Sequence, residues 1–337
     1  MGVQNKIVLN DKSQGKTIDI CGLNIVLPKK PKASEILFNE KSKKEQKWKR
    51  TDMPLGLDED TASKYQDFIN QEFTRRLEGV WFMNNGEPTY ITGEHYYYLN
   101  WCKLDIGYPN YRDRDRRFYM FWEHCTKDPD CFGLVMVKHR REGASYKGAA
   151  MLLYEVTANY NSHGGIISKT GADAKSLFTD KMVYMFRNLP FFFQPIIDGS
   201  DNPKSTLSFN QPGQKISKNF KTVTKSEALN SKIDWRNTKE NSYDSVKLLR
   251  YLCDEAGKWV DANVEKNWEV VRSCLTLGDK IIGKCFMPST VNELSKSGGE
   301  NFKNLWYDSD PDDVDANGRT RSGLYQYFTP AYDGYEG

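Results

Sequence analysis

The stretch GLVMVKHRREGASYKGAAMLLYEVTANY, residues 133–160, carries the pattern that decides the fold of this chain. Its first part, Gly133–Lys138, is a short apolar run typical of a buried strand, and a glycine-containing turn separates it from a helical pattern over Ser145–Tyr160. A second apolar run at Gly164–Lys169 precedes a second helical pattern over Ala172–Leu189. This alternation of strand and helix predicts a parallel sheet covered by helices.

The segments that follow add strands and helices to the predicted sheet. Leu248–Cys253 and Ile281–Phe286 have the character of strands, and helical patterns occur near Asp261–Cys274 and Gly299–Tyr307. The polar stretch Asp198–Asn230 alternates in short segments, which favours edge strands or a hairpin. We therefore expect an α/β fold with a mainly parallel central sheet flanked by helices.

The residues before this sheet predict helices and one hairpin. Helical patterns cover Asp60–Leu77 and Arg112–Lys127. Between them, Gly79–Met83 and Pro88–Thr92 indicate two strands joined by a tight turn. The aromatic segment His95–Trp101 predicts a helix packed in the core, and base stacking is the alternative interpretation.

Residues 1–50 are expected to form an appendage. Two short apolar runs, Lys6–Asn10 and Thr17–Pro28, predict a small hairpin. The basic cluster Lys41–Arg50, which surrounds Trp48, is expected to be a solvated segment. Contact of this cluster with DNA phosphates is the alternative interpretation.

The composition excludes several classes of protein. The chain has 337 residues, of which 38% are hydrophobic and 13% aromatic, as is typical of a folded globular protein. Its 48 basic and 45 acidic side chains leave a net charge of +3, which does not by itself indicate a nucleic-acid-binding protein. No apolar run is long enough to predict a membrane span, and the seven cysteines form no C-x-x-C pair. These features favour a reducing, intracellular setting.

The turn before the helix at Ser145 is similar to a P-loop, with two departures. A P-loop presents backbone N–H groups and a helix N-terminus to phosphates. Gly143 and Ser145 match the final glycine and the magnesium-binding hydroxyl, whereas Lys138 takes the first glycine position and Ala144 replaces the usual lysine. The missing charge would come from Lys138 or from one of the two arginines in the same turn. The predicted phosphate-binding set is Lys138, His139, Arg140, Arg141, Glu142, Gly143, Ala144 and Ser145.

Two acidic residues, Asp254 and Glu255, follow the predicted strand Leu248–Cys253. Walker-type ATPases place an Asp-Glu pair in this way, with the Asp in the Mg²⁺ shell and the Glu polarising the attacking water. Arg250 interrupts the apolar run, so we expect the strand to be exposed at that point. A helix-start signal is the alternative interpretation of the acidic pair.

A third motif, CFMPST at Cys285–Thr290, closes the strand that begins at Ile281. The hydroxyl groups of Ser289 and Thr290 can form hydrogen bonds to a γ-phosphate and couple its loss to movement. A turn with a helix cap at either residue is the alternative interpretation. The three motifs together are more specific than any one, because each follows a predicted strand and ligands of open α/β sheets bind at the carboxyl ends of strands.

In this combination the sequence resembles the ATPase of the large terminase subunit of tailed bacteriophages, and especially that of the crAss-like phages of Bacteroides. The resemblance spans roughly residues 60 to 330. It rests on four segments, which are GVWFMNNGEPTYITGEHYYYLNW, VKHRREGASYKGA, LCDEAGKW and MPSTVNELSKSGGENFKNLWYDS.

The resemblance implies a P-loop NTPase of the ASCE type that uses ATP and Mg²⁺. It implies that Ser145 and Asp254 hold the metal and that Glu255 orients the attacking water. Ser289 and Thr290 would form the coupling motif that reports hydrolysis to the part that grips DNA.

The resemblance also implies a trans-acting arginine and a set of partners. An arginine shortly before the Walker B strand is a candidate arginine finger, and Arg236 is the nearest match; a surface arginine or a local salt bridge is the alternative. The implied work is translocation of double-stranded DNA into a procapsid. The implied partners are the portal protein, the small terminase subunit and other copies of this chain in a ring, in the cytoplasm of the infected host.

The resemblance and the patterns predict four parts. They are an appendage over residues 1–59, a helical and hairpin part over 60–130, an ATPase core over 131–307 and a linker over 308–337. The acidic run Asp308–Asp315 is expected to be exposed within that linker. Terminases of this family continue into a nuclease domain, so we expect no nuclease activity from residues 1–337 by themselves.

Two other functions compete with this interpretation. One is another P-loop DNA translocase or helicase, although no motif for single-stranded DNA is identified in the sequence. The other is a non-catalytic DNA-binding protein with a degenerate P-loop, which Ala144 favours. Turnover of ATP separates an enzyme from a binding protein, and stimulation by single-stranded or duplex DNA separates a helicase from a packaging ATPase.

Overall fold

The structure of the chain divides into two compact units, which are described separately. The first unit comprises residues 1–142 and 305–337, and the second comprises residues 143–304. The computed structural model describes most of the chain, namely residues 16–38, 48–200, 202–210, 228–290 and 297–330.

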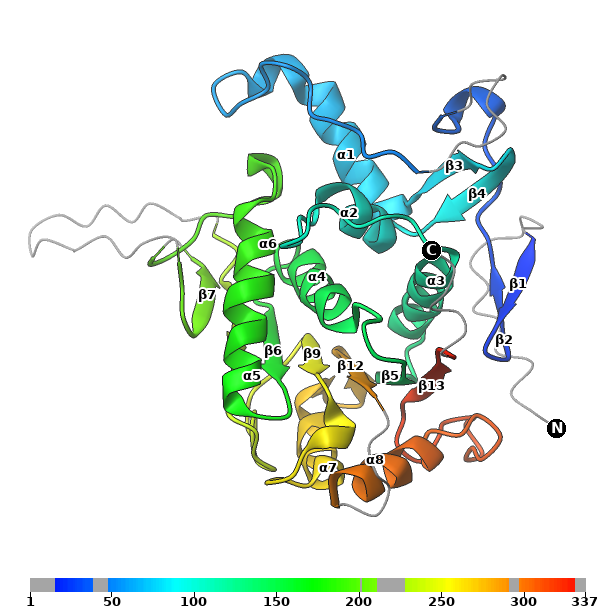
Figure 1. Ribbon diagram of the computed structural model, residues 1–337, viewed down its shortest axis with the longest axis vertical. Helices are drawn as coiled ribbons and strands as arrows, with labels where there is room; N and C mark the ends of the chain where they lie inside the picture. Colours follow the sequence, from blue (N-terminus) through cyan, green and yellow to red (C-terminus); the bar gives the residue numbers. More distant parts are fainter. Residues whose placement is uncertain (1–15, 39–47, 201, 211–227, 291–296, 331–337) are drawn as a thin grey trace, which may run out of the picture. The chain divides into compact units, whose positions relative to one another are not determined.

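One sheet of seven strands has the order β13-β5-β12-β9-β6-β8-β7 (Figure 1). Its neighbouring pairs β13–β5, β12–β9, β9–β6 and β6–β8 are parallel, and β7 is antiparallel to β8 at one edge. The predicted α/β fold with a mainly parallel sheet is confirmed. The strands are β5 (Gly133–Val137), β6 (His163–Ile167), β7 (Thr206–Phe209), β8 (Ser231–Trp235), β9 (Arg250–Cys253), β12 (Lys284–Ser289) and β13 (Tyr325–Phe328).

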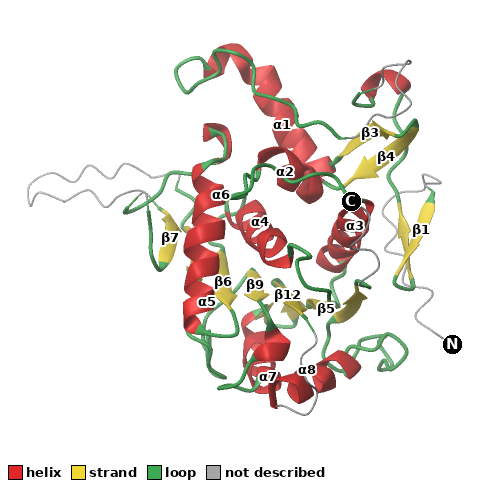
Figure 2. Cartoon of the chain, viewed as in Figure 1, coloured by secondary structure: helices red, strands yellow, loops and turns green. Residues whose placement is uncertain are grey.

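Helices flank the strands of the second unit (Figure 2). A continuous helical stretch over residues 171–187 contains a central π-helical segment between two α-helices. The helices and small strands are α4 (Ala144–Val156), α5 (Gly171–Ser176), η3 (Leu177–Val183), α6 (Tyr184–Arg187), η5 (Ala256–Lys258), α7 (Val264–Cys274), β10 (Thr276–Leu277), β11 (Lys280–Ile281) and α8 (Ser297–Tyr307), which continues into the first unit.

The two faces of β9 pack against different helices because successive side chains of a strand point to opposite faces. The hydroxyl of Tyr251 donates a hydrogen bond of 2.7 Å to Asn267 of α7. The next residue, Leu252, packs against α4 at Gly148, where a Cβ would lie 2.6 Å from a Leu252 methyl carbon. Gly148 therefore lets α4 approach the sheet closely.

Arg250 is buried in β9, so the expected exposure of the strand at this residue is wrong. Only 9% of the Arg250 surface is accessible, and its guanidinium lies 2.6 Å from a carboxylate oxygen of Glu155 in α4. The opposite charge on the adjacent helix offsets the cost of burying the arginine.

The first unit contains two antiparallel hairpins and three α-helices within its described residues. The predicted helix over Asp60–Leu77, the hairpin at Gly86 and the helix over Arg112–Lys127 are confirmed within a few residues. The elements before β5 are β1 (Thr17–Ile20), β2 (Leu23–Val26), η1 (Ala33–Glu35), η2 (Ala62–Tyr65), α1 (Gln66–Glu78), β3 (Val80–Asn84), β4 (Glu87–Ile91), α2 (Gly93–Trp101) and α3 (Asp113–Lys127).

Several elements differ in position from the predictions. A hairpin forms within Thr17–Val26, where β1 pairs with β2, and the predicted run Lys6–Asn10 lies outside the described residues. Most of the basic cluster Lys41–Arg50 also lies outside them. Within the segment 308–337, which was expected to be a linker, Tyr325–Phe328 forms β13 and pairs in parallel with β5.

The aromatic segment before the sheet forms part of a core. Every residue of α2 is buried, and the side chain of Thr92 accepts a hydrogen bond from the backbone N–H of His95 at the start of the helix. The prediction of a packed core helix is confirmed. In the part of the chain that the structure describes, no helix combines the length and apolar character needed to cross a membrane.

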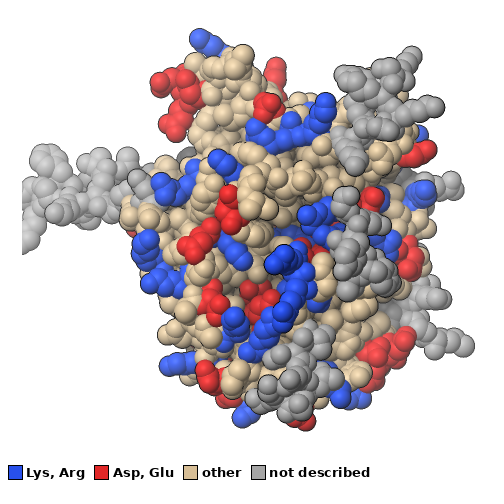
Figure 3. Space-filling view, viewed as in Figure 1, with Lys and Arg blue, Asp and Glu red and all other residues tan. Residues whose placement is uncertain are grey.

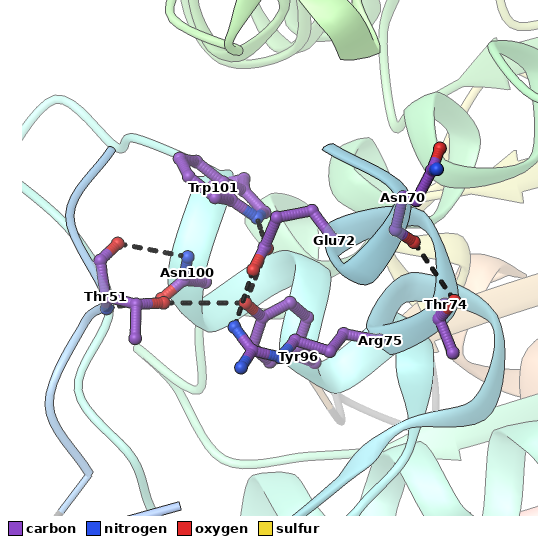
Figure 4. Close-up of polar contacts among 8 residues, drawn as sticks. All are labelled: Thr51, Asn70, Glu72, Thr74, Arg75, Tyr96, Asn100 and Trp101. Atoms are coloured by element: carbon purple, nitrogen blue, oxygen red, sulfur yellow. Dashed lines mark hydrogen bonds and ion pairs between the residues drawn. The ribbon is translucent and has the colours of Figure 1, made fainter. Parts of the chain in front are cut away.

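A buried carboxylate joins α1 to α2 (Figure 4). One oxygen of Glu72 accepts hydrogen bonds from the Tyr96 hydroxyl at 2.6 Å and the Trp101 indole at 2.9 Å, and the other lies 2.6 Å from the Arg75 guanidinium. Burial and the neighbouring Glu72 carboxylate raise the pKa of Tyr96, so its hydroxyl stays protonated as a donor. Asn100 extends this contact by accepting a hydrogen bond from the backbone N–H of Thr51.

We predict that Glu72→Gln lowers the free energy of unfolding by about 2–4 kcal/mol, because the amide turns an N–H₂ group toward buried donors and removes the charge facing Arg75. Chemical denaturation of the purified variant measures the change. Glu78→Gln, on the exposed surface of the same helix, is the control and should change stability by no more than about 0.5 kcal/mol. Equal effects of the two substitutions would contradict the role given to Glu72.

Candidate active site

The acidic pair lies at the carboxyl edge of the sheet in the second unit. The backbone N–H of Asp254 donates to the carbonyl of Ile167 in β6 at 2.9 Å, and that of Glu255 donates to the carbonyl of Pro288 in β12 at 2.8 Å. These two hydrogen bonds continue the pairing of β9 with both of its neighbours. The positions of both carboxylates are therefore set by the sheet itself.

Ser145 and Asp254 meet across this edge, although 109 residues separate them in the sequence. The Ser145 hydroxyl lies 3.1 Å from each carboxylate oxygen of Asp254. Ser145 is in the first turn of α4, which begins after Gly143 in the left-handed conformation (φ +77°). Glycine adopts this conformation without steric cost, so the chain can turn directly into the helix.

A hydroxyl and a carboxylate at this distance suit Mg²⁺, which prefers oxygen ligands. Among the described residues there is no group of three or more His, Cys, Asp or Glu side chains that could hold a metal ion. A Mg²⁺ ion at Ser145 and Asp254 would therefore take its other ligands from water and from substrate phosphates, as is usual for this ion.

Glu255 has a constrained backbone and a fixed carboxylate. Its backbone is left-handed (φ +52°, ψ 42°), which costs a non-glycine residue about 1–2 kcal/mol. One carboxylate oxygen lies 2.7 Å from the ammonium of Lys258 and accepts a hydrogen bond of 3.2 Å from the hydroxyl of Thr290. The side chain that the sequence predicts to be catalytic therefore contacts the predicted coupling motif directly.

Ser289 links the end of β12 to the turn after Glu255. Its hydroxyl accepts a hydrogen bond of 2.9 Å from the backbone N–H of Gly257 and donates one of 3.0 Å to the carbonyl of Thr290. Ser289 is fully buried. Both hydroxyl residues of the motif thus contact the segment that carries Glu255.

The part of the predicted P-loop that belongs to the first unit, residues 138–142, combines buried and exposed charges. Glu142 is buried, and one of its oxygens lies 2.6 Å from the His139 ring and 3.6 Å from the Arg114 guanidinium. Arg140 and Arg141 are both exposed, and Arg141 has a left-handed backbone (φ +65°). On the face drawn in Figure 3, Lys and Arg side chains are interspersed with Asp and Glu side chains.

Two further residues of the predicted loop are buried. Lys138, directly after β5, is 8% exposed, and Ala144, the first residue of α4, is 2% exposed. Ala144 has no polar side chain, so its position cannot supply the charge of the usual P-loop lysine. Lys138, Arg140 and Arg141 remain the candidates for that charge.

Arg236 follows β8 and lies apart from the acidic pair. Its guanidinium is 4.5 Å from the ring centre of Tyr243, and its backbone N–H donates to the carbonyl of Ile166. The structure therefore brings Ser145, Asp254, Glu255, Ser289 and Thr290 together and leaves Arg236 on a neighbouring strand end.

Two residues at this edge were not predicted from the sequence. Lys258 lies three residues after Glu255, but the left-handed backbone of Glu255 that brings the two side chains together is not predicted by the sequence. Tyr243 donates a hydrogen bond to Asp234 at 2.9 Å and accepts one from the N–H of Ile166 at 2.9 Å. Nothing in the sequence near Tyr243 indicates this long-range contact.

Comparison with known proteins gives a resemblance to solved structures only. No model of a protein family matches the chain, and no curated protein matches it. The chain is similar to the ATPase domain of the large terminase of Thermus phage P74-26, with 13% identity over 63% of this chain and 81% of that chain, and a TM-score of 0.43. A second structure, an arginine-to-alanine mutant of the same domain, gives 14% identity over 60% and 78% of the two chains, and a TM-score of 0.42.

Proposed function

We propose that this chain is a Mg²⁺-dependent ATP hydrolase whose active site lies at the carboxyl ends of β6, β9 and β12. The observation that carries the proposal is the contact of the Ser145 hydroxyl with both oxygens of Asp254, at 3.1 Å each. This contact joins the first turn of α4 to the end of β9. A hydroxyl and a carboxylate in these two places hold Mg²⁺ in P-loop enzymes.

In this proposal the loop between β5 and α4 binds the phosphates. The backbone N–H groups over residues 140–145 and the N-terminus of α4 face the substrate charge. Glu142 maintains the shape of the turn through its contacts with His139 and Arg114. Lys138, Arg140 or Arg141 neutralises the β- and γ-phosphates in place of the lysine that Ala144 replaces.

Glu255 would orient the water that attacks the γ-phosphate in line with the leaving group. When bound, Mg²⁺ would neutralise charge that develops on the phosphate oxygens. Thr290 shares a hydrogen bond with the Glu255 carboxylate, so loss of the γ-phosphate can be transmitted to β12 through a single contact. Ser289 accepts a hydrogen bond from the N–H of Gly257, so β12 and the turn that follows Glu255 would move together.

The work done by this ATPase is proposed from the sequence resemblance. We infer that the chain acts as the large terminase subunit of a tailed phage, of the crAss-like type, and drives double-stranded DNA into a procapsid. Its partners would be the portal protein, the small terminase subunit and neighbouring copies in a ring, in the cytoplasm of the infected host. Stimulation of ATP turnover by duplex DNA would support this function, whereas stimulation by single-stranded DNA alone would favour a helicase.

We predict that Glu255→Gln retains ATP binding and lowers the rate of hydrolysis by about 10²–10⁴-fold, because the amide preserves size but cannot orient water as a carboxylate does. Turnover assays and equilibrium binding of a fluorescent ATP analogue measure the two effects. Glu269→Gln, an exposed position on α7, is the control. A Glu255→Gln enzyme that hydrolyses ATP within a few-fold of the wild-type rate would refute the assignment.

The charge of the P-loop is tested by the single substitutions Lys138→Ala, Arg140→Ala and Arg141→Ala. At least one of them should weaken ATP binding by about 10-fold or more, because a hydrogen-bonded charge on phosphate contributes about 1.5–3 kcal/mol. Arg187→Ala, at the end of α6, is the matched control. Normal ATP binding by all three variants would favour a degenerate P-loop.

Arg236 is proposed as an arginine finger that acts on the neighbouring subunit. Arg236→Ala should then bind ATP normally and lose about 10³-fold or more of its hydrolysis rate. Mixing this variant with Glu255→Gln should restore part of the activity, because each subunit supplies the group that the other lacks. If the mixture stays as inactive as its components, Arg236 does not act in trans.

A further inference from the structure

Lys258 lies beside the proposed catalytic carboxylate, with its ammonium 2.7 Å from one oxygen of Glu255. It ends η5, the single helical turn that begins directly after Glu255. The proposed reaction leaves it without a role.

The backbone around Lys258 is held on both sides. Its N–H donates to the carbonyl of Glu255 at 2.9 Å, which closes the turn. Before it, Gly257 is bound to Ser289, and a Cβ at Gly257 would lie 2.9 Å from the Ser289 hydroxyl oxygen. After it, Trp259 is fully buried. The side chain of Lys258 therefore starts from a fixed point beside the carboxylate.

Several donors converge on the same oxygen of Glu255. The ammonium of Lys258 approaches it from η5, and the hydroxyl of Thr290 approaches it at 3.2 Å from the end of β12. The backbone N–H of Thr290 lies at 3.5 Å from the same atom. Contacts from two separate elements restrict the orientation of a carboxylate more than one contact does, because each contact limits a different motion of the side chain.

We propose that Lys258 is a positioning residue for the hydrolysis reaction, which holds one oxygen of Glu255 so that the carboxylate is aimed at the attacking water. The inference rests on the proposed function of Glu255. Lys258 acts through Glu255 and makes no contact with substrate in this role. The left-handed backbone of Glu255 brings the two side chains together across a single turn.

Lys258→Ala tests the proposal by steady-state kinetics in the whole chain. The value of kcat should fall by about 10–100-fold, the loss expected when a catalytic group is misplaced by about 1 Å, while the KM for ATP stays unchanged. Lys258→Arg, which keeps a cation within reach of the same oxygen, should recover most of kcat. Lys266→Ala, a lysine in an exposed 4.0 Å ion pair on α7, is the control and should leave both constants unchanged.

A second measurement separates positioning from a general loss of structure. In a Glu255→Gln background, Lys258→Ala should cause no further loss in single-turnover hydrolysis, because the carboxylate that it orients is absent. A kcat of Lys258→Ala equal to or above that of the wild type would overturn the proposal, as would a loss of equal size in the Glu255→Gln background. Full activity of Glu255→Gln alone would instead overturn the proposed function, and the role of Lys258 with it.

Discussion

The backbone hydrogen bonds that continue β9 beyond its last residue are the constraint on which the candidate site depends. Asp254 is bound to the end of β6 and Glu255 to β12, so two adjacent carboxylates start from fixed points between two parallel neighbours. One of them meets the hydroxyl of Ser145 and the other that of Thr290. The site thereby joins three chain segments, and the sheet rather than a long loop sets the positions of its carboxylates.

Much of this arrangement could be predicted from the sequence for a physical reason. Strands buried on both faces are near-continuous apolar runs, and β5, β6 and β9 have this character. The sequence therefore predicted both these strands and the positions of their carboxyl ends. The carboxyl ends of parallel strands meet at one edge of a sheet. The contact between Asp254, which follows a strand, and Ser145, which begins a helix, could therefore be expected from the sequence. The packed core helix α2 was similarly marked by its density of aromatic residues.

The rest depended on contacts that local patterns do not contain. β12 begins at Lys284 and not at Ile281, because Ile281 pairs with Thr276 in the β10–β11 hairpin. Lys284 is itself buried, although a lysine normally indicates an exposed position. Arg250 is expected to be exposed for the same reason, yet Glu155 lies beside it and offsets its charge. The position of Lys258 near the carboxylate follows from a left-handed glutamate, a conformation that the sequence of a non-glycine residue does not predict.

The left-handed backbone at Glu255 also places stability and activity in opposition at one position. Glycine or asparagine adopts φ values near +52° with less strain than glutamate, so either residue would suit this turn better as a matter of folding alone. Neither carries the carboxylate to which the proposed function assigns the orientation of water. If that function holds, selection for thermal stability without selection for turnover would be expected to replace Glu255 early, and the resulting protein would be more stable but inactive.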